Sequence, residues 1–157
     1  MKLRPLLAAL ALFLTAALPL QAQEKKITRV GDFQIIAIFE KGRFDRCAAV
    51  LTNGTGMLRL AYTTKRVYSL SVPGVKGHGP DEMALRFDGG ASQFYFATGA
   101  NDDRAWLTLD QSAVDAFRDS SEQFDVDFAG RAYSWSLYNA AMTDVFVAIE
   151  DCTGARM

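Results

Sequence analysis

The chain has 157 residues, of which 50% are hydrophobic and 22% are charged, and its formal net charge is −1 at pH 7. Acidic and basic residues are interspersed, so the sequence offers neither the basic stripe of a nucleic-acid-binding protein nor a polybasic patch for anionic lipid. No internal repeat, low-complexity tract or interdomain linker is present.

The N-terminal residues are typical of a secretory signal peptide. Lys2 and Arg4 precede an apolar run over residues 6–18, which Pro19 and the small Ala22 follow. The run is too short for a membrane anchor across about 30 Å of hydrocarbon. We therefore expect cleavage after Ala22, no integral membrane segment in the mature chain, and a periplasmic or secreted protein.

The remaining chain has the size of one domain. Residues 1–22 form the predicted signal peptide, residues 23–30 are polar and are expected to be a flexible leader, and residues 31–157 are expected to form a single β-rich domain. Loss of the signal peptide moves the formal charge from −1 to about −3. Lys25, Lys26 and Arg29 are read as part of a solvated tail.

Two cysteines, Cys47 and Cys152, predict one disulfide in an exported chain. The bond would close a loop of roughly 100 residues, for which the chain-entropy model gives about 4.7 kcal/mol before strain is subtracted. The spacing is not C-x-x-C and the only histidine is His78. The pattern therefore favours a structural disulfide over a redox-active or metal-binding pair.

Alternating apolar and polar residues predict about nine short strands. In chain order they cover residues 32–39, 47–51, 57–62, 67–72, 83–87, 92–98, 106–109, 124–128 and 131–136. The first is apolar on both faces, which is typical of a central strand. Connections are mostly hairpin-sized, and Asn53-Gly54 is a strong turn signal, so antiparallel pairing is expected.

Two helices are expected. Asp110 is a good N-cap for a short helix that ends near Asp119. Residues 136–152 carry apolar residues, Tyr138 and Met142 among the first, at helical spacing. The predicted fold is mainly β (α+β): an antiparallel β-sandwich-like or open-barrel domain with one short helix and a C-terminal amphipathic helix packed on the sheet and joined to it through Cys47.

The sequence indicates no catalytic site, metal site or cofactor. His78 lies in the glycine-rich loop 73–80 with nothing in the sequence to orient it, and no serine has the G-x-S-x-G pattern. Asp125 and Asp127 alternate along one strand, so we expect them on its solvent face.

Most aromatic residues are expected to fill the core. Tyr95 and Trp106 are candidates for an exposed patch because their strand neighbours already supply apolar partners. The turn expected at residues 43–46 places charged side chains around an aromatic one. The candidate binding patch comprises Arg43, Phe44, Arg46, Lys76, His78, Tyr95 and Trp106.

The order of several short motifs resembles the invasion-associated locus B family of exported bacterial proteins. The motifs are Val30-Gly31-Asp32-Phe33-Gln34, Asp45-Arg46-Cys47-Ala48, Leu70-Ser-Val-Pro-Gly-Val75, Leu85-Arg-Phe-Asp-Gly89, the short helix at 109–118, and Ser136-Leu137 at the start of the last helix. The resemblance covers nearly all of the mature chain. It implies a periplasmic or surface-associated, non-enzymatic β-rich domain, linked in that family to host-cell invasion, and it implies no catalytic residues.

We therefore expect an exported, non-enzymatic domain of the bacterial envelope that binds a protein partner, with an invasion-associated role implied by the resemblance. Two alternatives stay open. One is a periplasmic inhibitor or immunity-type protein that inserts the loop at 75–81 into an enzyme cleft. The other is a small hydrolase whose site the sequence does not reveal.

Overall fold

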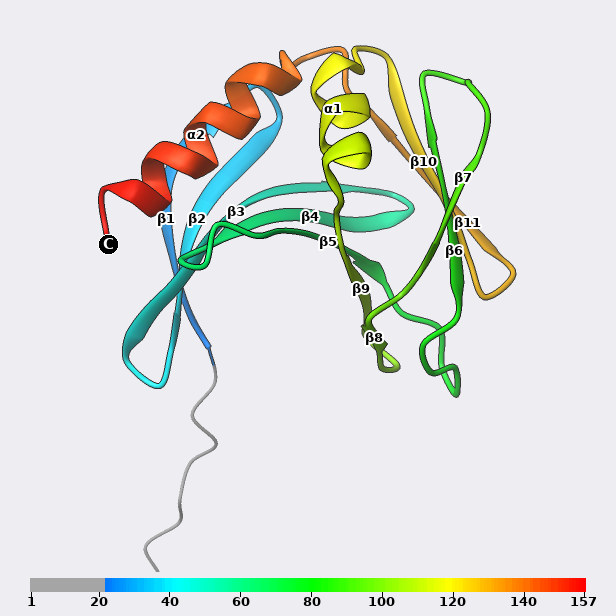
Figure 1. Cartoon of the computed structure of the whole chain (residues 1–157), viewed down its shortest axis with the longest axis horizontal. Helices are drawn as coiled ribbons and strands as arrows, with labels where there is room; N and C mark the ends of the chain where they lie inside the picture. Colours follow the sequence, from blue (N-terminus) through cyan, green and yellow to red (C-terminus); the bar gives the residue numbers. More distant parts are fainter. Residues whose placement is uncertain (1–21) are drawn as a thin grey trace, which may run out of the picture.

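Two antiparallel β-sheets and two α-helices form the part of the chain that the computed structural model describes, residues 22–157 (Figure 1). The strands are β1 (Gln23–Val30), β2 (Phe33–Glu40), β3 (Arg43–Asn53), β4 (Gly56–Thr63), β5 (Tyr68–Pro73), β6 (Glu82–Phe87), β7 (Gln93–Phe96), β8 (Gly99–Ala100), β9 (Arg104–Thr108), β10 (Gln123–Phe128) and β11 (Arg131–Ser136). The helices are α1 (Gln111–Asp119) and α2 (Met142–Gly154). The mainly β fold and the C-terminal helix packed on a sheet are confirmed. The predicted signal peptide lies outside the described residues, apart from its last residue.

The large sheet has seven strands in the order β1-β2-β3-β4-β5-β9-β8, and the small sheet has four in the order β11-β10-β6-β7. Strand β2 lies between β1 and β3, as its two apolar faces predicted. The β2–β3 turn places Lys41 and Gly42 at φ values of 52° and 75°, which suits the twist of a two-residue hairpin. At the next turn, the Asn53 side chain accepts a hydrogen bond from the backbone N–H of Thr55 at 2.9 Å, in the hairpin that Asn53-Gly54 predicted.

The flexible leader predicted at residues 23–30 is wrong. These residues form β1, which pairs antiparallel with β2 along its whole length. The apolar side chains of Ile27 and Val30 pack against the core. Most of the other side chains in the segment are charged or polar and exposed, which is common on an edge strand because only one neighbour covers it. Polarity alone therefore did not distinguish a leader from an edge strand.

One hydrophobic core joins the inner faces of both sheets and the two helices. The ring centroids of Phe117 and Phe124 are 4.4 Å apart, and those of Phe124 and Trp135 are 6.1 Å apart. The indole Nε1 of Trp135 donates to the carbonyl oxygen of Gly56 at 3.0 Å. This bond ties β11 of the small sheet to the start of β4 in the large sheet.

The first helix begins as predicted. The carboxylate of Asp110 accepts a hydrogen bond from the backbone N–H of Ala113 at 2.8 Å, so it satisfies one of the free donors at the N-terminus of α1.

The second helix is shorter than predicted. It begins at Met142, and the predicted start at residue 136 is wrong. The backbone N–H of Leu137 donates to Glu122 at 2.9 Å, which extends the pairing of β10 and β11 beyond Ser136. Tyr138 therefore lies outside the helix, with 72% of its surface exposed.

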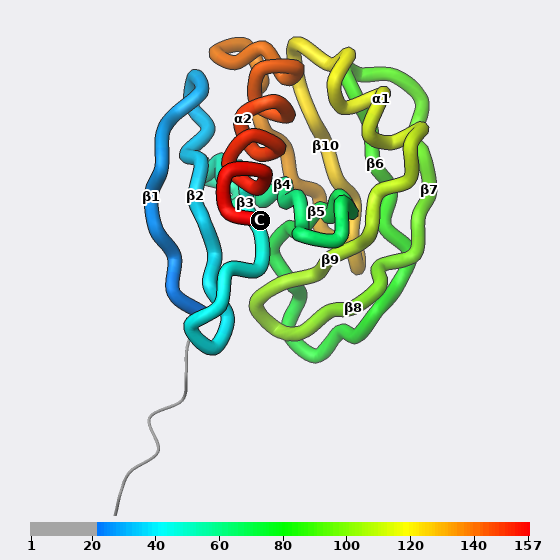
Figure 2. The backbone as a smooth tube through the Cα atoms, turned by 60° about the vertical axis from the view of Figure 1, so that its left-hand side comes forward, coloured from blue at the N-terminus to red at the C-terminus, as the bar shows by residue number. Residues whose placement is uncertain are grey.

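The predicted disulfide is present. Cys47 in the middle of β3 is bonded to Cys152 in the last turns of α2, with 6.0 Å between their Cα atoms. Beside the bond, the hydroxyl of the fully buried Thr153 donates to the carbonyl oxygen of Tyr62 at 3.0 Å. Figure 2 shows α2 beside β2 and in front of β3 and β4, and the helix packs on β1 to β4.

A polar cluster joins the two helices to β5. The Tyr68 hydroxyl donates to Glu150 of α2, and Arg118 of α1 donates to both groups. The Arg118 guanidinium also lies 4.8 Å from the ring centroid of Phe146. Burial, and then the bond to the negative Glu150, raise the pKa of Tyr68 well above its usual value. The cluster therefore has a structural role, because it links α1 and α2 to β5.

Asp88 ties the end of β6 to the segment between α1 and β10. Its carboxylate accepts hydrogen bonds from the backbone N–H groups of Ser121, Glu122 and Gln123 at 2.8–2.9 Å. Burial by itself would raise the pKa of Asp88, but the three donors outweigh it and hold the pKa below its usual 3.8. The charged form is therefore preferred in the folded state.

We expect Asp88→Asn to lower the free energy of unfolding by about 1 kcal/mol at neutral pH, a small value because the carboxylate is exposed. Because folding lowers the pKa of Asp88, its carboxylate stabilises the folded state above about pH 4. This stabilisation is lost as the pH falls through the lowered pKa of Asp88. Urea midpoints measured at about pH 7 and pH 2 should therefore differ between variant and wild type only at the higher pH. Asp127→Asn, on an exposed carboxylate of β10, is the matched control. An equal loss in both variants would contradict this role of Asp88.

Candidate functional site

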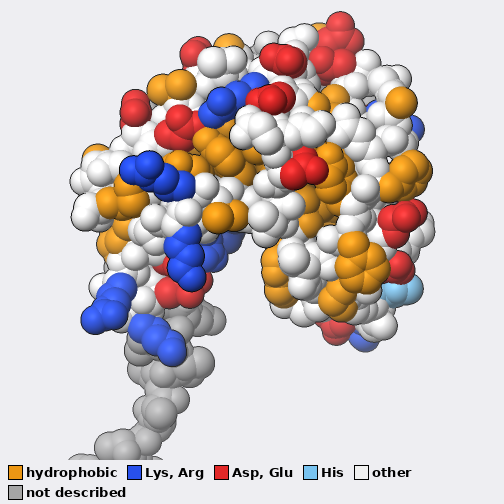
Figure 3. Space-filling view, viewed as in Figure 1, with side chains coloured by type: hydrophobic (Ala, Val, Ile, Leu, Met, Phe, Trp, Pro, Cys, Tyr) orange, Lys and Arg blue, Asp and Glu red, His pale blue; other side chains and the backbone are white. Residues whose placement is uncertain are grey.

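The face of the large sheet that is turned away from the helices carries a second, small apolar cluster. Ile36, Ile38, Ala48 and Ala61 are at most 4% exposed there, with Val50 packed beside them. No helix among the described residues covers this face, which the view in Figure 3 shows as a hollow beneath the sheet, with Lys and Arg side chains along one margin.

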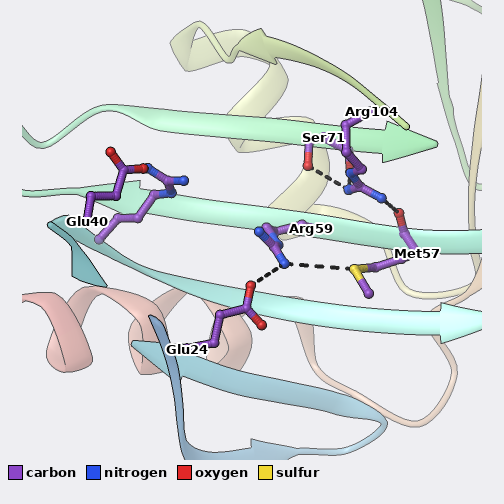
Figure 4. A network of polar contacts seen from close by, with 7 residues as sticks. Glu24, Glu40, Met57, Arg59, Ser71 and Arg104 are labelled. Carbon is purple, nitrogen blue, oxygen red and sulfur yellow. Dashed lines mark hydrogen bonds and ion pairs between the residues drawn. The ribbon is translucent and has the colours of Figure 1, made fainter. Parts of the chain in front are cut away.

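The sheet bends around this cluster. Arg59 of β4 and Glu24 of β1 form an ion pair at 2.7 Å, although β2 and β3 lie between their strands. Strands spaced at about 4.8 Å would hold β1 and β4 about 14 Å apart in a flat sheet. The two side chains therefore reach toward each other across β2 and β3 (Figure 4), and the curvature of the sheet seen in Figure 1 shortens the distance between them.

Next to the small cluster lies a cavity of about 400 Å³, which we call the arginine pocket. Its lining comes from β3, β4, β5, β9 and the loop before β9. The lining residues are Arg46, Arg59, Ala61, Thr63, Ser69, Ser71, Asn101, Arg104 and Trp106. In the part of the chain that the structure describes, they include three arginines and no carboxylate, and the small side chains of Ala61, Ser69 and Ser71 leave the space between them open.

Arg104 is held by neutral acceptors. Its Nη1 donates to the carbonyl oxygen of Met57 at 2.6 Å, and its Nη2 donates to the carbonyl oxygen and the hydroxyl of Ser71 at 2.7 and 2.6 Å (Figure 4). Within residues 22–157, Arg104 has no carboxylate partner. Burial, and then the charge of Arg59, lower the pKa of Arg104 to about 10. It stays positive at neutral pH, but its charge is not neutralised.

The other two arginines of the pocket, Arg46 and Arg59, form ion pairs with carboxylates that lie outside the pocket. Arg59 binds Glu24, while its Nε is buried and has no hydrogen-bond partner within the described residues. Arg46 donates through Nη1 to Glu40 at 3.0 Å and also to Asp45. The carboxylates therefore lie toward the β1–β3 side, and the positive charge remains at the Arg104 side.

Trp106 forms the aromatic part of the lining and is 39% exposed. Its ring lies against Gly99 of β8, where an added Cβ would meet the indole at 2.3 Å. Only glycine leaves room for the ring in this position. The pairing of Gly99 with Trp106 across β8 and β9 thus fixes the indole beside Arg104.

Of the seven residues predicted as a binding patch, the structure brings Arg46 and Trp106 together in the arginine pocket. Arg43 and Phe44 lie in β3 and not in a turn, and the Phe44 ring packs against Phe39 at 5.8 Å. Lys76 and His78 lie in the exposed loop after β5, and the pocket lining does not include them.

Tyr95 does not face solvent as predicted, because it packs against the main core. Its partner across the strands is the fully buried Met83, and directly paired residues point to the same face of a sheet. Phe94 and Phe96 therefore point outward, and they are 64% and 67% exposed.

We call Phe94 and Phe96 the aromatic edge, because β7 is the last strand of the small sheet among the described residues. Figure 2 shows β7 at the margin of the molecule. The backbone N–H of Ala97 donates to Asp81 at 2.9 Å, so alternate residues of β7 bond toward β6. By this alternation, the backbone groups of Phe94 and Phe96 point away from β6.

Acidic residues lie beside Phe94 of the aromatic edge. Asp81, Glu82 and Asp127 line a shallow depression beside Phe94, and no basic residue among residues 22–157 lines it. Asp125 on the same strand as Asp127 is 8% exposed, so the expectation that both face solvent is wrong for Asp125. Arg86 covers it, with an Nε–Oδ2 distance of 3.3 Å.

Sequence reasoning missed Arg59, Arg104 and the aromatic edge. The alternation in residues 57–62 did imply that Arg59 points opposite Leu58 and Leu60, so a signal for its face existed. Arg104 lay just before the strand predicted at residues 106–109 and was assigned to no element. Nothing in the sequence indicated that β4 and β9 would each stand beside β5 and bring these two arginines together.

Comparison with known proteins finds no matching family model and no significant match among curated proteins or solved structures. Neither helix in residues 22–157 is long and apolar enough to cross a membrane. In the same residues, no group of three His, Cys, Asp or Glu side chains is placed to hold a metal ion. The fold and the surfaces define a disulfide-linked, two-sheet β domain.

Proposed function

We propose that the chain is an exported, non-enzymatic domain of the bacterial envelope that binds a protein partner through the aromatic edge. The observation that carries the proposal is the exposure of two phenylalanines, Phe94 and Phe96, on neighbouring outward positions of one edge strand. Large exposed aromatic groups of this kind are enriched where proteins bind one another.

The backbone of β7 supports binding of an extended segment. The outward N–H and C=O groups of Phe94 and Phe96 can pair with an added strand, while their side chains contact alternate side chains of that strand. An unpaired apolar edge is also a site of aggregation, which proteins normally avoid. A partner strand that pairs with β7 would prevent this aggregation.

The surrounding charges define the chemistry of the partner. Asp81, Glu82 and Asp127 place negative charge beside the Phe94 ring, and none of the described basic residues lies in the same depression. A partner strand with apolar side chains and Lys or Arg at its flanks complements this surface. The bound segment is therefore proposed to be extended and basic.

Export is proposed from two features. The disulfide between Cys47 and Cys152 is typical of an oxidising compartment such as the periplasm, and the predicted signal peptide provides a route to it. An invasion-associated role is part of the proposal through the motif resemblance alone.

Capture from envelope extract tests the proposal. Immobilised wild-type protein is expected to retain an envelope protein that the double variant Phe94→Ser, Phe96→Ser does not retain. Binding of the purified partner should then weaken by at least about tenfold in the double variant, because clustered aromatic side chains dominate such interfaces.

Tyr138→Ser is the matched control, because Tyr138 is an exposed aromatic residue between β11 and α2, outside the aromatic edge. It should bind the purified partner as the wild type does. The proposal fails if the double variant keeps its fold and binds that partner with unchanged affinity. A partner that is itself a hydrolase and loses activity on binding would identify the chain as an inhibitor.

A further inference from the structure

We propose that the arginine pocket is a binding site for a small organic oxyanion, a carboxylate or a phosphate, carried on a planar ring that packs against Trp106. The site is separate from the aromatic edge, and the proposal does not depend on the protein partner. Four features of the described residues lead to this ligand class.

The first feature is uncompensated positive charge. Arg46, Arg59 and Arg104 line the pocket, and no carboxylate of residues 22–157 belongs to the lining. Arg46 and Arg59 bind carboxylates that lie outside it, whereas Arg104 has only neutral acceptors within the described chain. The lowered pKa of Arg104 reports its burial and the repulsion from Arg59. An anion between these two guanidinium groups would relieve that repulsion.

The second feature is the number of free donors. A guanidinium has five N–H groups, and Arg104 uses three of them on Met57 and Ser71. This leaves its Nε–H and one N–H on Nη1. Within residues 22–157, Nη1 of Arg59 and Nη2 of Arg46 make no hydrogen bond with a protein acceptor. The free donors are spread over three guanidinium groups, so the oxygens of a carboxylate or phosphate would be bound by more than one arginine.

The third feature is rigidity. Each arginine projects from a strand in the large sheet, and the bonds of Arg104 to Met57 and Ser71 fix its guanidinium plane in the absence of a ligand (Figure 4). Binding therefore requires little ordering of side chains, which is the main entropic cost at flexible arginines. Thr63, Ser69 and Asn101 add neutral polar groups to the same lining.

The fourth feature is the shape and aromatic wall of the pocket. A volume of about 400 Å³ fits a small molecule. The exposed part of the Trp106 indole offers a flat apolar surface beside Arg104, held in place by Gly99. A ligand with both an oxyanion and a ring can contact the arginines and Trp106 together, whereas an inorganic anion can contact only the arginines.

Titration calorimetry on the wild-type protein at low salt tests the proposal with four probes: phenyl phosphate, benzoate, inorganic phosphate and benzyl alcohol. We expect phenyl phosphate, benzoate or both to bind, and to bind more tightly than inorganic phosphate. The neutral benzyl alcohol should show no binding. The two ring anions decide between phosphate and carboxylate as the preferred oxyanion, and salt should weaken the binding.

Fluorescence gives an independent readout. The protein has two tryptophans, and Trp135 is fully buried, whereas Trp106 is 39% exposed in the pocket. The bound ring anion should change the emission of the wild type, and this change should be absent in Trp106→Phe. A change that persists in Trp106→Phe would place the ligand elsewhere and overturn the proposal.

Arg104→Gln should weaken binding of the ring anion by at least about tenfold, the effect of losing a charged donor. Arg131→Gln, which removes an exposed arginine on β11 of the small sheet, is the charge-matched control and should bind normally. Because Arg104 also bonds to backbone carbonyls, Arg59→Gln is measured as well, and circular dichroism melting establishes that each variant is folded.

The proposal is overturned if neither ring anion binds, if benzyl alcohol binds as tightly as they do, or if Arg131→Gln weakens binding as much as the pocket variants. It is also overturned if folded Arg104→Gln and Arg59→Gln both bind with wild-type affinity. Tighter binding of ring anions than of inorganic phosphate, lost in the pocket variants alone, establishes the site.

Discussion

Replacing both Cys47 and Cys152 by alanine is expected to lower the free energy of unfolding by about 4 kcal/mol. The two residues are 105 positions apart, and in the chain-entropy model a bond across about 100 residues removes about 4.7 kcal/mol of loop entropy from the unfolded state. Native strain and residual structure in the unfolded chain reduce this value. The loss is comparable with the whole stability of a small domain.

The position of the bond explains why the loss should be so large. Cys47 is fully buried in β3, and Cys152 lies in the last turns of α2, which covers β1 to β4. Without the bond, α2 is held by its apolar face, by the hydroxyl of Thr153 on Tyr62 and by the Glu150 cluster. These contacts form only once the chain is folded, so they do not restrict the unfolded state as the disulfide does.

Equilibrium unfolding in urea, with and without a reductant, measures this effect. The midpoint of the wild type should fall in reductant toward that of the double alanine variant, and the variant itself should not respond to reductant. Because the chain has only two cysteines, no other pairing can form within it. A wild-type midpoint that is the same in both conditions would contradict the stabilising role of the bond.

Trp135→Ala is expected to lower the free energy of unfolding by about 3–5 kcal/mol, the usual range for an aromatic residue removed from a core. Trp135 is fully buried and lies between Phe124 and Tyr133, with centroid distances of 6.1 and 6.0 Å. Its indole N–H also bonds to Gly56. Alanine would leave a cavity and an unpaired carbonyl oxygen where the two sheets meet.

Two further variants separate these contributions. Trp135→Phe keeps most of the ring volume but loses the donor, so it should lose about 1–3 kcal/mol from the unsatisfied carbonyl oxygen of Gly56. Trp106→Phe removes the same indole from a partly exposed position and should change stability by less than about 1 kcal/mol. The urea midpoints of the three variants, compared with that of the wild type, measure these losses of stability. A small loss in Trp135→Ala would contradict the role of Trp135 in joining the sheets.

Local patterns in the sequence predicted those parts of the fold that depend on local chemistry. Asp110 predicted the cap of α1 because an N-cap acts within one helical turn. The two apolar faces around Ile36 and Ile38 predicted a central strand, since both faces of β2 are buried. The turn at Asn53-Gly54 followed from backbone conformations that these residues tolerate.

The errors arose where one pattern fits two environments. The segment 23–30 is polar both as a free leader and as an edge strand, and only pairing with β2 selects the strand. In β7, both sets of alternating residues include apolar side chains, so the pattern does not say which set faces the core. The pairing of Tyr95 with Met83 decides it, and this pairing exposes Phe94 and Phe96.

The sequence by itself determined the class of fold, the pairing of the two cysteines and most of the elements, because spacing, turn chemistry and the number of cysteines are local or countable properties. The tertiary structure alone decided the arginine pocket. Arg46, Arg59 and Arg104 belong to β3, β4 and β9, and they meet because β9 returns to pair with β5 and the sheet bends. The physical reason is that long-range strand pairing depends on the packing of the whole core, which no single stretch of sequence contains.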